Sequence, residues 1–588
     1  MEKTIIRRHY NLDKATFPDD MDPLLARIYC ARGINNIQEL EHTLKRLLDY
    51  RTIKGIQAAA EILADAIVHQ NSLLIVGDFD CDGATSTAVG MLALQSMGGN
   101  VRFLVPNRFD FGYGLTPEIV EEATKHNTPD VLITVDNGIS SLEGVRVAKE
   151  KGIKVIITDH HLAGKQLPEA DVIVNPNQPG CPFPGKNSAG VSVIFYLMCV
   201  LLSSLRQQNW FHEKTEPKLA ELLDLVALGT VADVVSLDNN NRILVSQGLA
   251  RIRAGYCRPG ISALIHIANR HQKQLTTADL GFALGPRLNA AGRLDDMSLG
   301  ITLLLTNDPS EAHALAQQLD ELNQDRKSIE QSMQAEALSV LKNIPLNQHH
   351  ELPWGISLYN RDWHQGVIGI LASRIKEQFN RPVVAFADAD NDHVPNNSDQ
   401  EIKGSARSIS GLHIRDTLAD IHSHHPDLII KFGGHAMAAG LTLKKQDLPL
   451  FETSFNQAVK KRLSADDLKP VLLTDGLLKS SEITLERAHQ LQTCAPWGQN
   501  FPEPCFDGCF HIVQQRLVGK KHLKLVLQAP DSSQLIDAIA FNIDTDIWPS
   551  PAVTALEAVY TLSVNEYRGE KNIQLIINYL KPRSSLKP

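Results

Sequence analysis

Short apolar runs alternate with stretches of helical periodicity between Leu73 and about Val235. The runs have the length of buried strands, and the stretches between them, such as GATSTAVGMLALQSMG, have the apolar spacing of helices. In chain order the strand-like runs are LLIVG, VRFLV, VLITV, KVIIT and DVIVN. Such a series predicts βαβ units, and therefore a largely parallel, doubly wound α/β sheet.

Three other patterns surround this series. Apolar positions three and four apart in DPLLARIYCARGI and IQELEHTLKRLLDY predict helices near the N-terminus, and residues 311–343 keep a helical period for about nine turns without Gly or Pro. Strand-like runs recur in a second α/β segment near residues 354–445, and again after residue 470, where they predict a small β-barrel. We therefore expect an N-terminal helical cap (1–50), a doubly wound α/β domain (51–300), a connecting helix (301–345), a smaller α/β domain (346–455) and a β-barrel (456–588).

Composition places this multidomain chain among ordinary globular proteins. It has 588 residues, of which 43% are hydrophobic and 21% are charged. The start, MEKTIIRRHYNLD, lacks the apolar segment of a secretion signal, and no apolar run approaches the ~20 residues that span a bilayer, so we expect a cytoplasmic protein without a membrane anchor. Of the eight cysteines only Cys505 and Cys509 lie close together, and all are expected to be reduced thiols rather than zinc ligands.

The net charge of −9 limits the possible partners. It argues against a protein that coats nucleic acid through bulk positive charge, although local basic grooves are compatible with it. No G-x-x-x-x-G-K-[ST] stretch is present, which argues against nucleotide-triphosphate chemistry and against a helicase motor in this chain.

The most informative stretch is GDFDCDG, residues 77–83, where Asp78, Asp80 and Asp82 alternate directly after an apolar strand. Such a density of acids is costly unless cations neutralise it. A calcium-binding EF-hand begins in the same way, but it needs a bidentate acid at its twelfth position, where this chain has Val89. The sequence therefore favours a different kind of metal site.

Polar residues follow two more strands. Asp136 follows VLITV, and Asp159, His160 and His161 follow KVIIT. Ligands of open α/β sheets bind outside the carboxyl ends of the strands, so these groups should converge with the first three acids, and oxygen and imidazole ligands suit Mn²⁺ or Mg²⁺. The alternative is that each aspartate caps a helix or turn. Asp233, which follows the helical run KLAELLDLVALG, is open to both readings.

Nine motifs resemble, in this order, those of the DHH/DHHA1 phosphoesterases and, among them, the RecJ family of bacterial single-strand DNA exonucleases. They are DFDCDG, GYGL, VDNGIS, DHH, GTVADVV, GPRLNAAGR, RDWHQGVIGI, KGSARS and FGGHAMAAG. The resemblance implies a DHH catalytic domain for residues 51–300, a DHHA1 substrate-binding domain for 346–455 and an OB-like nucleic-acid-binding domain for 456–588. The activity that it implies is 5′→3′ hydrolysis of single-stranded DNA to 5′-mononucleotides with two metal ions, in DNA recombination and repair.

The resemblance also implies a set of metal ligands, carried over by position. One ion would be held by Asp78, Asp80 and Asp136, and the other by Asp82, Asp136, His160 and Asp233, with Asp136 as the bridge.

One ligand departs from the pattern of other family branches. These have a histidine four residues before the acid that matches Asp80, whereas this chain has Val76 there, and we assign the role to Asp78. The catalytic candidates Asp159 and His161 are expected to orient the neighbouring His160 or to contact the scissile phosphate.

Arginines, lysines and glycine-rich turns provide candidate contacts to nucleic acid. Each can also be an ordinary turn or surface residue. The candidates are Arg108, Tyr113, Arg287, Arg293, His364, Lys403, Ser405, Arg407, Gly433, Gly434 and His435, together with basic residues around 516–524 and 567–571 of the tail. The resemblance favours Ser405 and Arg407 for recognition of the 5′ end.

Two alternatives to the exonuclease stay open. One is a DHH-family phosphodiesterase acting on short oligonucleotides, pAp or cyclic dinucleotides, which generally needs only the two lobes. The other is a non-catalytic DNA-binding scaffold, which should have lost metal ligands. From the resemblance we also expect single-strand-binding protein and a helicase as partners, and action as a monomer.

Overall fold

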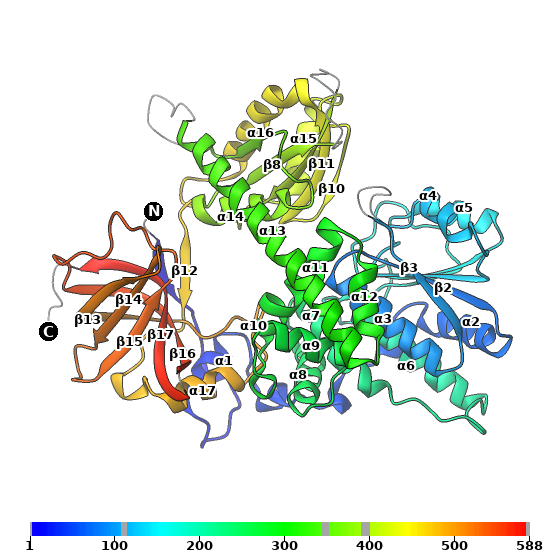
Figure 1. The fold of residues 1–588 in the computed structure, drawn as a ribbon, viewed down its shortest axis with the longest axis horizontal. Coiled ribbons are helices and arrows are strands. Elements are labelled where there is room, and N and C mark those ends of the chain that lie inside the picture. Colours follow the sequence, from blue (N-terminus) through cyan, green and yellow to red (C-terminus); the bar gives the residue numbers. More distant parts are fainter. Residues whose placement is uncertain (1–2, 108–113, 344–351, 390–399, 568, 584–588) are drawn as a thin grey trace. The chain divides into compact units, whose positions relative to one another are not determined.

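The computed structural model describes residues 3–107, 114–343, 352–389, 400–567 and 569–583. The chain divides into two compact units (Figure 1). The larger unit consists of residues 7–320 and 473–588, and the smaller consists of residues 1–6 and 321–472. Each unit has a β-sheet and a hydrophobic core of its own.

A parallel five-stranded sheet with the order β3-β2-β4-β5-β6 organises the first part of the larger unit. Its strands coincide with the five apolar runs of the sequence: β2 (Ser72–Gly77), β3 (Asn100–Leu104), β4 (Val131–Val135), β5 (Lys154–Thr158) and β6 (Val172–Val174). The chain leaves β2 for β3 on one side and later returns to β4 on the other. The carboxyl ends of β2 and β4 therefore form the topological switch point, where such sheets bind ligands.

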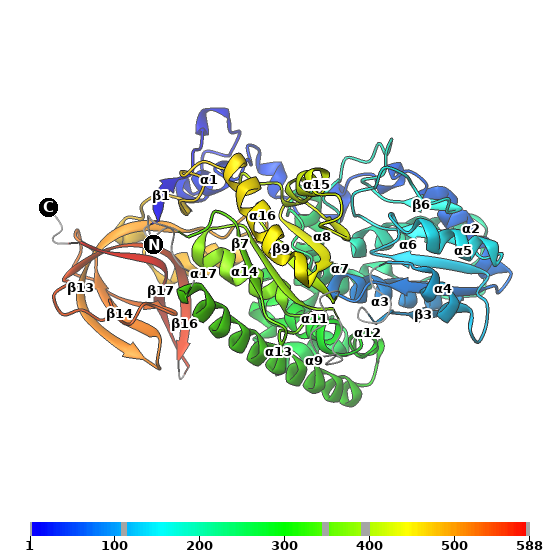
Figure 2. The ribbon, with the colours of Figure 1, turned by 90° about the horizontal axis from the view of Figure 1, so that it is seen from above.

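Helices cover both faces of this sheet, which confirms the doubly wound fold (Figures 1 and 2). Strand residues such as Leu74, Leu132 and Val155 form one buried cluster with α4 and α5. On the other face Gly90 of α3 lets Ile75 and Ile194 of α6 approach closely. The helices are α2 (Ile56–Val68), α3 (Cys81–Ser96), α4 (Pro117–Thr124), α5 (Leu142–Glu150) and α6 (Gly190–Gln207).

A group of helices follows the parallel sheet in the larger unit. They are α7 (Leu223–Ala232), α8 (Asn239–Arg253), α9 (Pro259–Ile267), α10 (Thr277–Asp279), α11 (Gly285–Leu294) and α12 (Ser298–Leu305). The connecting helix expected over 301–345 is α13 (Pro309–Asn343), which begins with proline at its first position, where the missing N–H costs nothing. Residues 298–305 form the separate helix α12 because Thr306 has extended backbone.

The smaller unit contains a mixed sheet with the order β10-β11-β9-β8-β7, in which only β7 and β8 are parallel. The expected boundary at residue 455 falls inside α16, whose Phe451 and Phe455 lie in the core of this unit, so the domain must extend beyond α16. The strands are β7 (Ile356–Tyr359), β8 (Val383–Asp388), β9 (Glu401–Arg407), β10 (Lys431–Gly434) and β11 (Ala438–Lys444), and the helices are α14 (Ile368–Phe379), α15 (Ile414–His424) and α16 (Leu448–Arg462).

The tail forms a closed five-stranded barrel, as expected of an OB-type domain, with the order β13-β14-β15-β17-β16 (Figure 2). The barrel strands are β13 (Phe506–Val518), β14 (His522–Gln528), β15 (Leu535–Ala540), β16 (Ala555–Tyr567) and β17 (Glu570–Arg583), and β12 (Val471–Thr474) and α17 (Leu485–Thr493) precede them.

The N-terminal region differs from the expected helical cap. Residues 3–50 contain one α-helix, α1 (Pro23–Cys30), besides the strand β1 (Thr4–Arg7) and short 3₁₀ turns. The stretch IQELEHTLKRLLDY forms only 3₁₀ turns of three or four residues. A segment of this length is only marginally stable as a helix by itself, so its helical periodicity does not decide its structure. Arg32 ties the region to Asp475 through a buried ion pair of 2.7 Å.

One described helix, α6, is long and apolar enough to cross a membrane, with a mean hydropathy of 1.5 over 18 residues. The expectation that no apolar run approaches the ~20 residues that span a bilayer was therefore wrong for this segment. The helix is 72% buried inside the unit, where it packs against α2 and α3, and this burial accounts for its apolar sequence. All eight cysteines are unpaired thiols, as expected.

Candidate active site

Three acids follow β2 at the switch point of the sheet. Asp80 is the N-cap of α3 and accepts a hydrogen bond from the Gly83 N–H at 2.9 Å, so the capping role considered for strand-end aspartates applies to it. Asp82 is buried in the first turn of α3. Its carboxylate oxygens accept hydrogen bonds from the N–H groups of Gly190 and Val191, at 2.6 and 3.0 Å. The start of α6 therefore fixes the Asp82 carboxylate.

Asp136, directly after β4, has an unusual backbone conformation. Its φ is +63°, in the left-handed region, which costs of order 1–3 kcal/mol for a residue with a side chain. The residue is only 2% exposed. Gly190 lies against it, since a Cβ at position 190 would be 2.5 Å from Asp136 Oδ1. Only glycine fits there, and the sequence analysis did not identify this residue.

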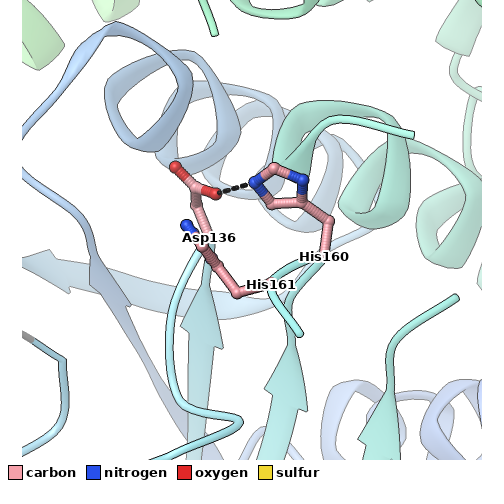
Figure 3. Close-up of side chains that lie close together, drawn as sticks. All are labelled: Asp136, His160 and His161. Carbon is pink, nitrogen blue, oxygen red and sulfur yellow. Dashed lines mark ion pairs between the residues drawn. The ribbon is translucent and has the colours of Figure 1, made fainter. Parts of the chain in front are cut away.

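His160 lies close to two carboxylates, those of Asp136 and Asp233, which come from different parts of the chain. Its Nε2 lies 3.1 Å from Asp136 Oδ1 (Figure 3) and 3.5 Å from Oδ2 of Asp233, the residue after α7. A second glycine, Gly229 of α7, makes room for the Asp82 carboxylate, because a Cβ there would be 2.8 Å from Asp82 Oδ1. Helix α7 can therefore place Asp233 beside the sheet only with a glycine at this position.

Possible metal ligands gather in three overlapping groups within the described part of the chain, and in each group the ligand atoms lie within 4.8 Å of one another. The groups are Asp78, Asp80 and Asp136; Asp82, His160 and Asp233; and Asp136, His160 and His161. The structure thus brings together all six expected ligands. The first group is the set expected for one ion, and the second contains three of the four ligands expected for the other. Asp136 joins His160 in the third group, together with His161. Oxygen and imidazole donors suit Mn²⁺ and Mg²⁺.

The electrostatics of the cluster favour added cations. Burial, reinforced by the charge of Asp80, raises the pKa of Asp82 to about 7. Burial, and then the neighbouring carboxylates, also raise the pKa values of Asp136 and Asp233 well above the usual range. Asp233 Oδ2 is buried and accepts no hydrogen bond within the described residues. Divalent cations would supply the charge that this donor set needs, so the residues fit such ions.

Asp159 pairs with His161, which itself belongs to the third of these groups. Asp159 accepts hydrogen bonds from the N–H groups of Ile139, His160 and His161, and its Oδ1 lies 2.7 Å from His161 Nδ1. Burial opposes a charge on His161, but the contact with Asp159 raises the pKa of His161 to about 9. Asp159 therefore orients the His161 ring, whereas it contacts His160 through the backbone.

The raised carboxyl pKa values predict how pH and metal ions affect stability. The folded, metal-free cluster binds more protons than the unfolded chain, whose carboxyl pKa is about 4, so its contribution to stability is lost as pH rises towards and beyond about 7. In thermal melts, the increase in Tm from Mn²⁺ over EDTA should be greater at pH 8 than at pH 6, by roughly 3 °C or more. An equal or smaller increase at pH 8 would contradict this electrostatic account.

The segment GPRLNAAGR forms α11 and packs against the acid loop. Asn289 Oδ1 accepts a hydrogen bond from the Cys81 N–H at 2.8 Å. A side chain at Gly292 would overlap the carbonyl oxygen of Phe79. Asn289 and Gly292 therefore position the loop between the ligands, which the sequence analysis did not foresee.

The two arginines of α11 were expected to contact phosphate. Arg287 is engaged within the unit, where its Nη2 pairs with Asp320 at 2.8 Å and its Nη1 donates to the Ala283 carbonyl at 2.6 Å. Arg293 lies half-buried at the end of the helix. Their phosphate contacts stay predictions. Arg108 and Tyr113 lie outside the described residues.

The smaller unit brings several expected substrate contacts together. Lys403, Ser405 and Arg407 alternate with buried residues along β9 and so share one face of the sheet. Arg407 Nη1 donates to Ser405 Oγ at 3.1 Å. Gly369, in the first turn of α14, lies against both, since a Cβ there would be 2.8 Å from Arg407 Nη2 and 3.0 Å from Ser405 Oγ. A guanidinium, a hydroxyl and a helix N-terminus thus meet, which suits an anion.

Burial lowers the pKa of Arg407, and no acid among the described residues contributes to its shift. Among the described residues, therefore, no nearby carboxylate neutralises the guanidinium. Across the strands Ser405 is in register with Gly440, which is in register with Gly433. Among the described residues, a Cβ at Gly440 would meet only the Gly404 carbonyl at 4.0 Å, and one at Gly433 would meet nothing within 4 Å, so this glycine row leaves open space beside Ser405.

The remaining expected contacts lie at the edges of this face. Gly434 has φ +142° and begins a tight turn in which the His435 N–H donates to the Ala438 carbonyl at 2.8 Å. His364 precedes α14, and its Nδ1 accepts a hydrogen bond from the Gly366 N–H at 3.1 Å. These roles stay predictions, as does that of the basic tail hairpin, where Lys524 pairs with Asp537 at 2.9 Å.

Comparison with protein families finds three matching domains. Residues 72–230 match the DHH family, N-terminal domain, residues 354–461 match the DHHA1 domain, and residues 474–579 match the RecJ OB domain.

Curated relatives match over nearly the whole chain. The single-stranded-DNA-specific exonuclease RecJ of Dickeya dadantii is 54% identical over 96% of this chain and 97% of the relative. The protein of the same name from Escherichia coli is 51% identical over 99% of this chain and 100% of the relative. Among solved structures, that of RecJ in complex with Mn²⁺ from Thermus thermophilus has a TM-score of 0.78 at 27% identity, covering 99% of this chain and 80% of that one.

Proposed function

This chain belongs to the RecJ family of single-stranded-DNA-specific exonucleases, and from this premise we propose that it degrades single-stranded DNA from the 5′ end and releases 5′-mononucleotides. It is a metal-dependent nuclease that uses Mn²⁺ or Mg²⁺. The observation that carries the proposal is the convergence of two groups of carboxylate and imidazole ligands at the switch point of the sheet. Every expected acid is present, which disfavours a non-catalytic scaffold.

We assign the ligands to two cations. Asp78, Asp80 and Asp136 would hold one, and Asp82, Asp136, His160 and Asp233 would hold the other. When bound, such ions activate water as a nucleophile and neutralise the charge that develops on the phosphate. The chain has to keep its ligands in place. Gly190 and Gly229 allow close approach, and the α6 N–H groups fix Asp82.

His161 completes the centre in this proposal. Its Nδ1 lies 2.7 Å from Asp159 Oδ1, and this contact orients the ring. An imidazole held in this way beside the metal ligands can donate a hydrogen bond to an oxygen of the scissile phosphate. His161 therefore binds and orients the substrate, whereas Asp159 positions His161.

The arginine, serine and α14 N-terminus of the smaller unit suit recognition of the 5′-terminal phosphate. Arg407→Gln should lower the rate of hydrolysis of 5′-phosphorylated strands about tenfold or more, because one hydrogen bond to a charged group contributes roughly 1.5–3 kcal/mol. The rate on 5′-hydroxyl strands should change little. Initial rates on both substrates measure this preference.

A matched control for this variant is Arg415→Gln, which removes an exposed arginine of α15 in the same unit. It should leave the preference for a 5′-phosphate unchanged. Equal losses on both substrates with Arg407→Gln would assign Arg407 to general substrate binding or to folding.

The proposed function is tested with single-stranded DNA labelled separately at each end, incubated with the protein and Mn²⁺ alongside duplex and dinucleotide controls. Early release of the 5′ label as mononucleotide, with the duplex intact, is the expected result. Early release of the 3′ label would reverse the polarity. Cleavage of the dinucleotide alone would favour the small-substrate phosphodiesterases, which the OB barrel otherwise disfavours.

The proposed function includes a cellular location and protein partners. The protein acts in the cytoplasm, as a monomer, in DNA recombination and repair, and it contacts single-strand-binding protein and a helicase that supplies unwound strand. A pull-down with purified single-strand-binding protein at physiological salt tests direct contact, and its failure would remove that partner.

A further inference from the structure

Residues 239–278 contain no aspartate or glutamate, although the chain as a whole has a net charge of −9. They form α8, α9 and the 3₁₀ helix η6 (Gln272–Gln274). The basic residues of this stretch are Arg242, Arg251, Arg253, Arg258, Arg270 and Lys273, with His266 and His271. None of them is used by the metal centre.

A cavity of about 350 Å³ lies between the end of α8 and η6. Its lining includes Arg253, His271 and Lys273 and no acid. Two hydrogen bonds hold its walls together, one from Arg253 Nε to the Leu275 carbonyl and one from Gln272 Nε2 to the Ile252 carbonyl, both at 2.8 Å. The cavity is therefore formed by defined contacts between the two elements.

The nearest acid in sequence after this stretch is already engaged. Asp279 pairs with Arg270 Nε at 3.1 Å and accepts hydrogen bonds from Thr276. Lys273 is exposed, and no described acid lies within ion-pair distance of it or of His271 or Arg253. Positive charge in the cavity is thus available to an external anion.

An exposed aromatic residue follows the cavity lining in the sequence. Tyr256 is 71% exposed and follows Gly255, a lining residue with φ +87°. Cationic side chains next to an exposed ring suit single-stranded nucleic acid, whose phosphates bind the cations and whose bases stack on the ring. An acidic peptide would use the cations but not the ring, so the combination favours nucleic acid.

The cavity lies away from the metal centre. Helices α7 and α8 run antiparallel, because Gly248, near the end of α8, packs against the carbonyl of Leu223 at the start of α7. Asp233 lies at the opposite end of this hairpin, close to where α8 begins. At about 1.5 Å per residue, the length of α8 separates Arg253 from that end by about 20 Å.

We propose that this basic cavity, together with Tyr256, is a second binding site for single-stranded nucleic acid, which holds the strand several nucleotides from the bond being cleaved. The inference rests on the proposed function in that the ligand is the same substrate. A strand that spans both sites binds more tightly than a short one, because the second contact forms within the same complex.

The test uses the full chain in EDTA, where strands are not hydrolysed, and measures the affinities of a fluorescent 40-nucleotide oligothymidylate and of a trinucleotide. Lys273→Glu should lower the ratio of the two affinities about tenfold at low salt, and should reduce the slope of log affinity against log salt by about 0.7 per lost phosphate contact. Tyr256→Ala should lower the ratio about fivefold through loss of stacking.

Lys154→Glu is the matched control, since it makes the same charge change at an exposed position at the amino end of β5. Its ratio should equal that of the unmodified protein, and thermal melts should show all variants folded. An unchanged ratio with Lys273→Glu would overturn the proposal. The proposal would also be overturned if Lys273→Glu weakened binding of labelled poly-glutamate but left the affinity for the long strand unaltered. The ligand of the cavity would then be an acidic protein. Because affinity is measured in EDTA, without hydrolysis, this test does not depend on the outcome of the activity assay.

Discussion

Asp136→Asn should abolish hydrolysis of single-stranded DNA while leaving strand binding nearly intact. The substitution keeps the size of the side chain but removes the charge of the carboxylate that we assign to both cations. Metal-ion catalysis supplies several kcal/mol of transition-state stabilisation, so turnover with Mn²⁺ should fall at least about 10³-fold. Affinity for a long strand in EDTA should stay within about threefold, because the proposed phosphate contacts lie on other elements.

Stability gives an independent readout of the same variant. The pKa of Asp136 lies well above the usual range because of burial and neighbouring carboxylates, so a neutral asparagine should make the metal-free protein at least as stable as the unmodified one at pH 8. Asp65→Asn, which removes an exposed carboxylate of α2, is the control and should leave turnover unchanged. Turnover of Asp136→Asn within tenfold of the unmodified protein would remove Asp136 from the metal centre.

Gly190→Ala should be nearly as damaging as loss of a ligand, although position 190 has no side chain to contribute. The added methyl group would lie 2.5 Å from Asp136 Oδ1 and 2.7 Å from Asp136 Cβ, so the carboxylate has to move. Movement of the α6 start would also disturb the N–H groups that hold Asp82. We expect turnover to fall about 100-fold or more, since displacements of about 1 Å in active sites have effects of that size.

Metal affinity distinguishes this account from general damage. Mn²⁺ titrations should show weaker binding to Gly190→Ala, and raising the Mn²⁺ concentration should recover part of its activity. Gly164→Ala is the matched control, because a Cβ there would meet only the Gln166 carbonyl at 3.7 Å. Full Mn²⁺ affinity in a folded but inactive Gly190→Ala protein would contradict the positioning role.

The parallel sheet and the cluster of possible metal ligands were predictable because their signals are local. Each strand is an unbroken apolar run, and each acid directly follows a strand, so chain direction alone places Asp78, Asp136 and His160 at one edge of the sheet. Asp233 was a weaker candidate, because it ends a helix rather than a strand and approaches the cluster only through the packing of α7.

Other features depend on contacts between residues far apart in the sequence. Gly190 and Gly229 carry no chemical signal of their own, and their importance appears only when the side chains of Asp136 and Asp82 are seen against them. In the same way GPRLNAAGR suggested phosphate binding from its arginines, whereas Asn289 and Gly292 contact the acid loop. The N-terminal region had helical periodicity but forms short turns held by tertiary ion pairs such as Arg32–Asp475.

The location of bound Mn²⁺ tests the central claim most directly. Anomalous scattering from crystals of the protein grown with Mn²⁺ should show two peaks at the carboxyl ends of β2 and β4. One should be bound by Asp78, Asp80 and Asp136, and the other by Asp82, Asp136, His160 and Asp233. A single ion, or ions bound away from Asp136, would contradict the two-cation account.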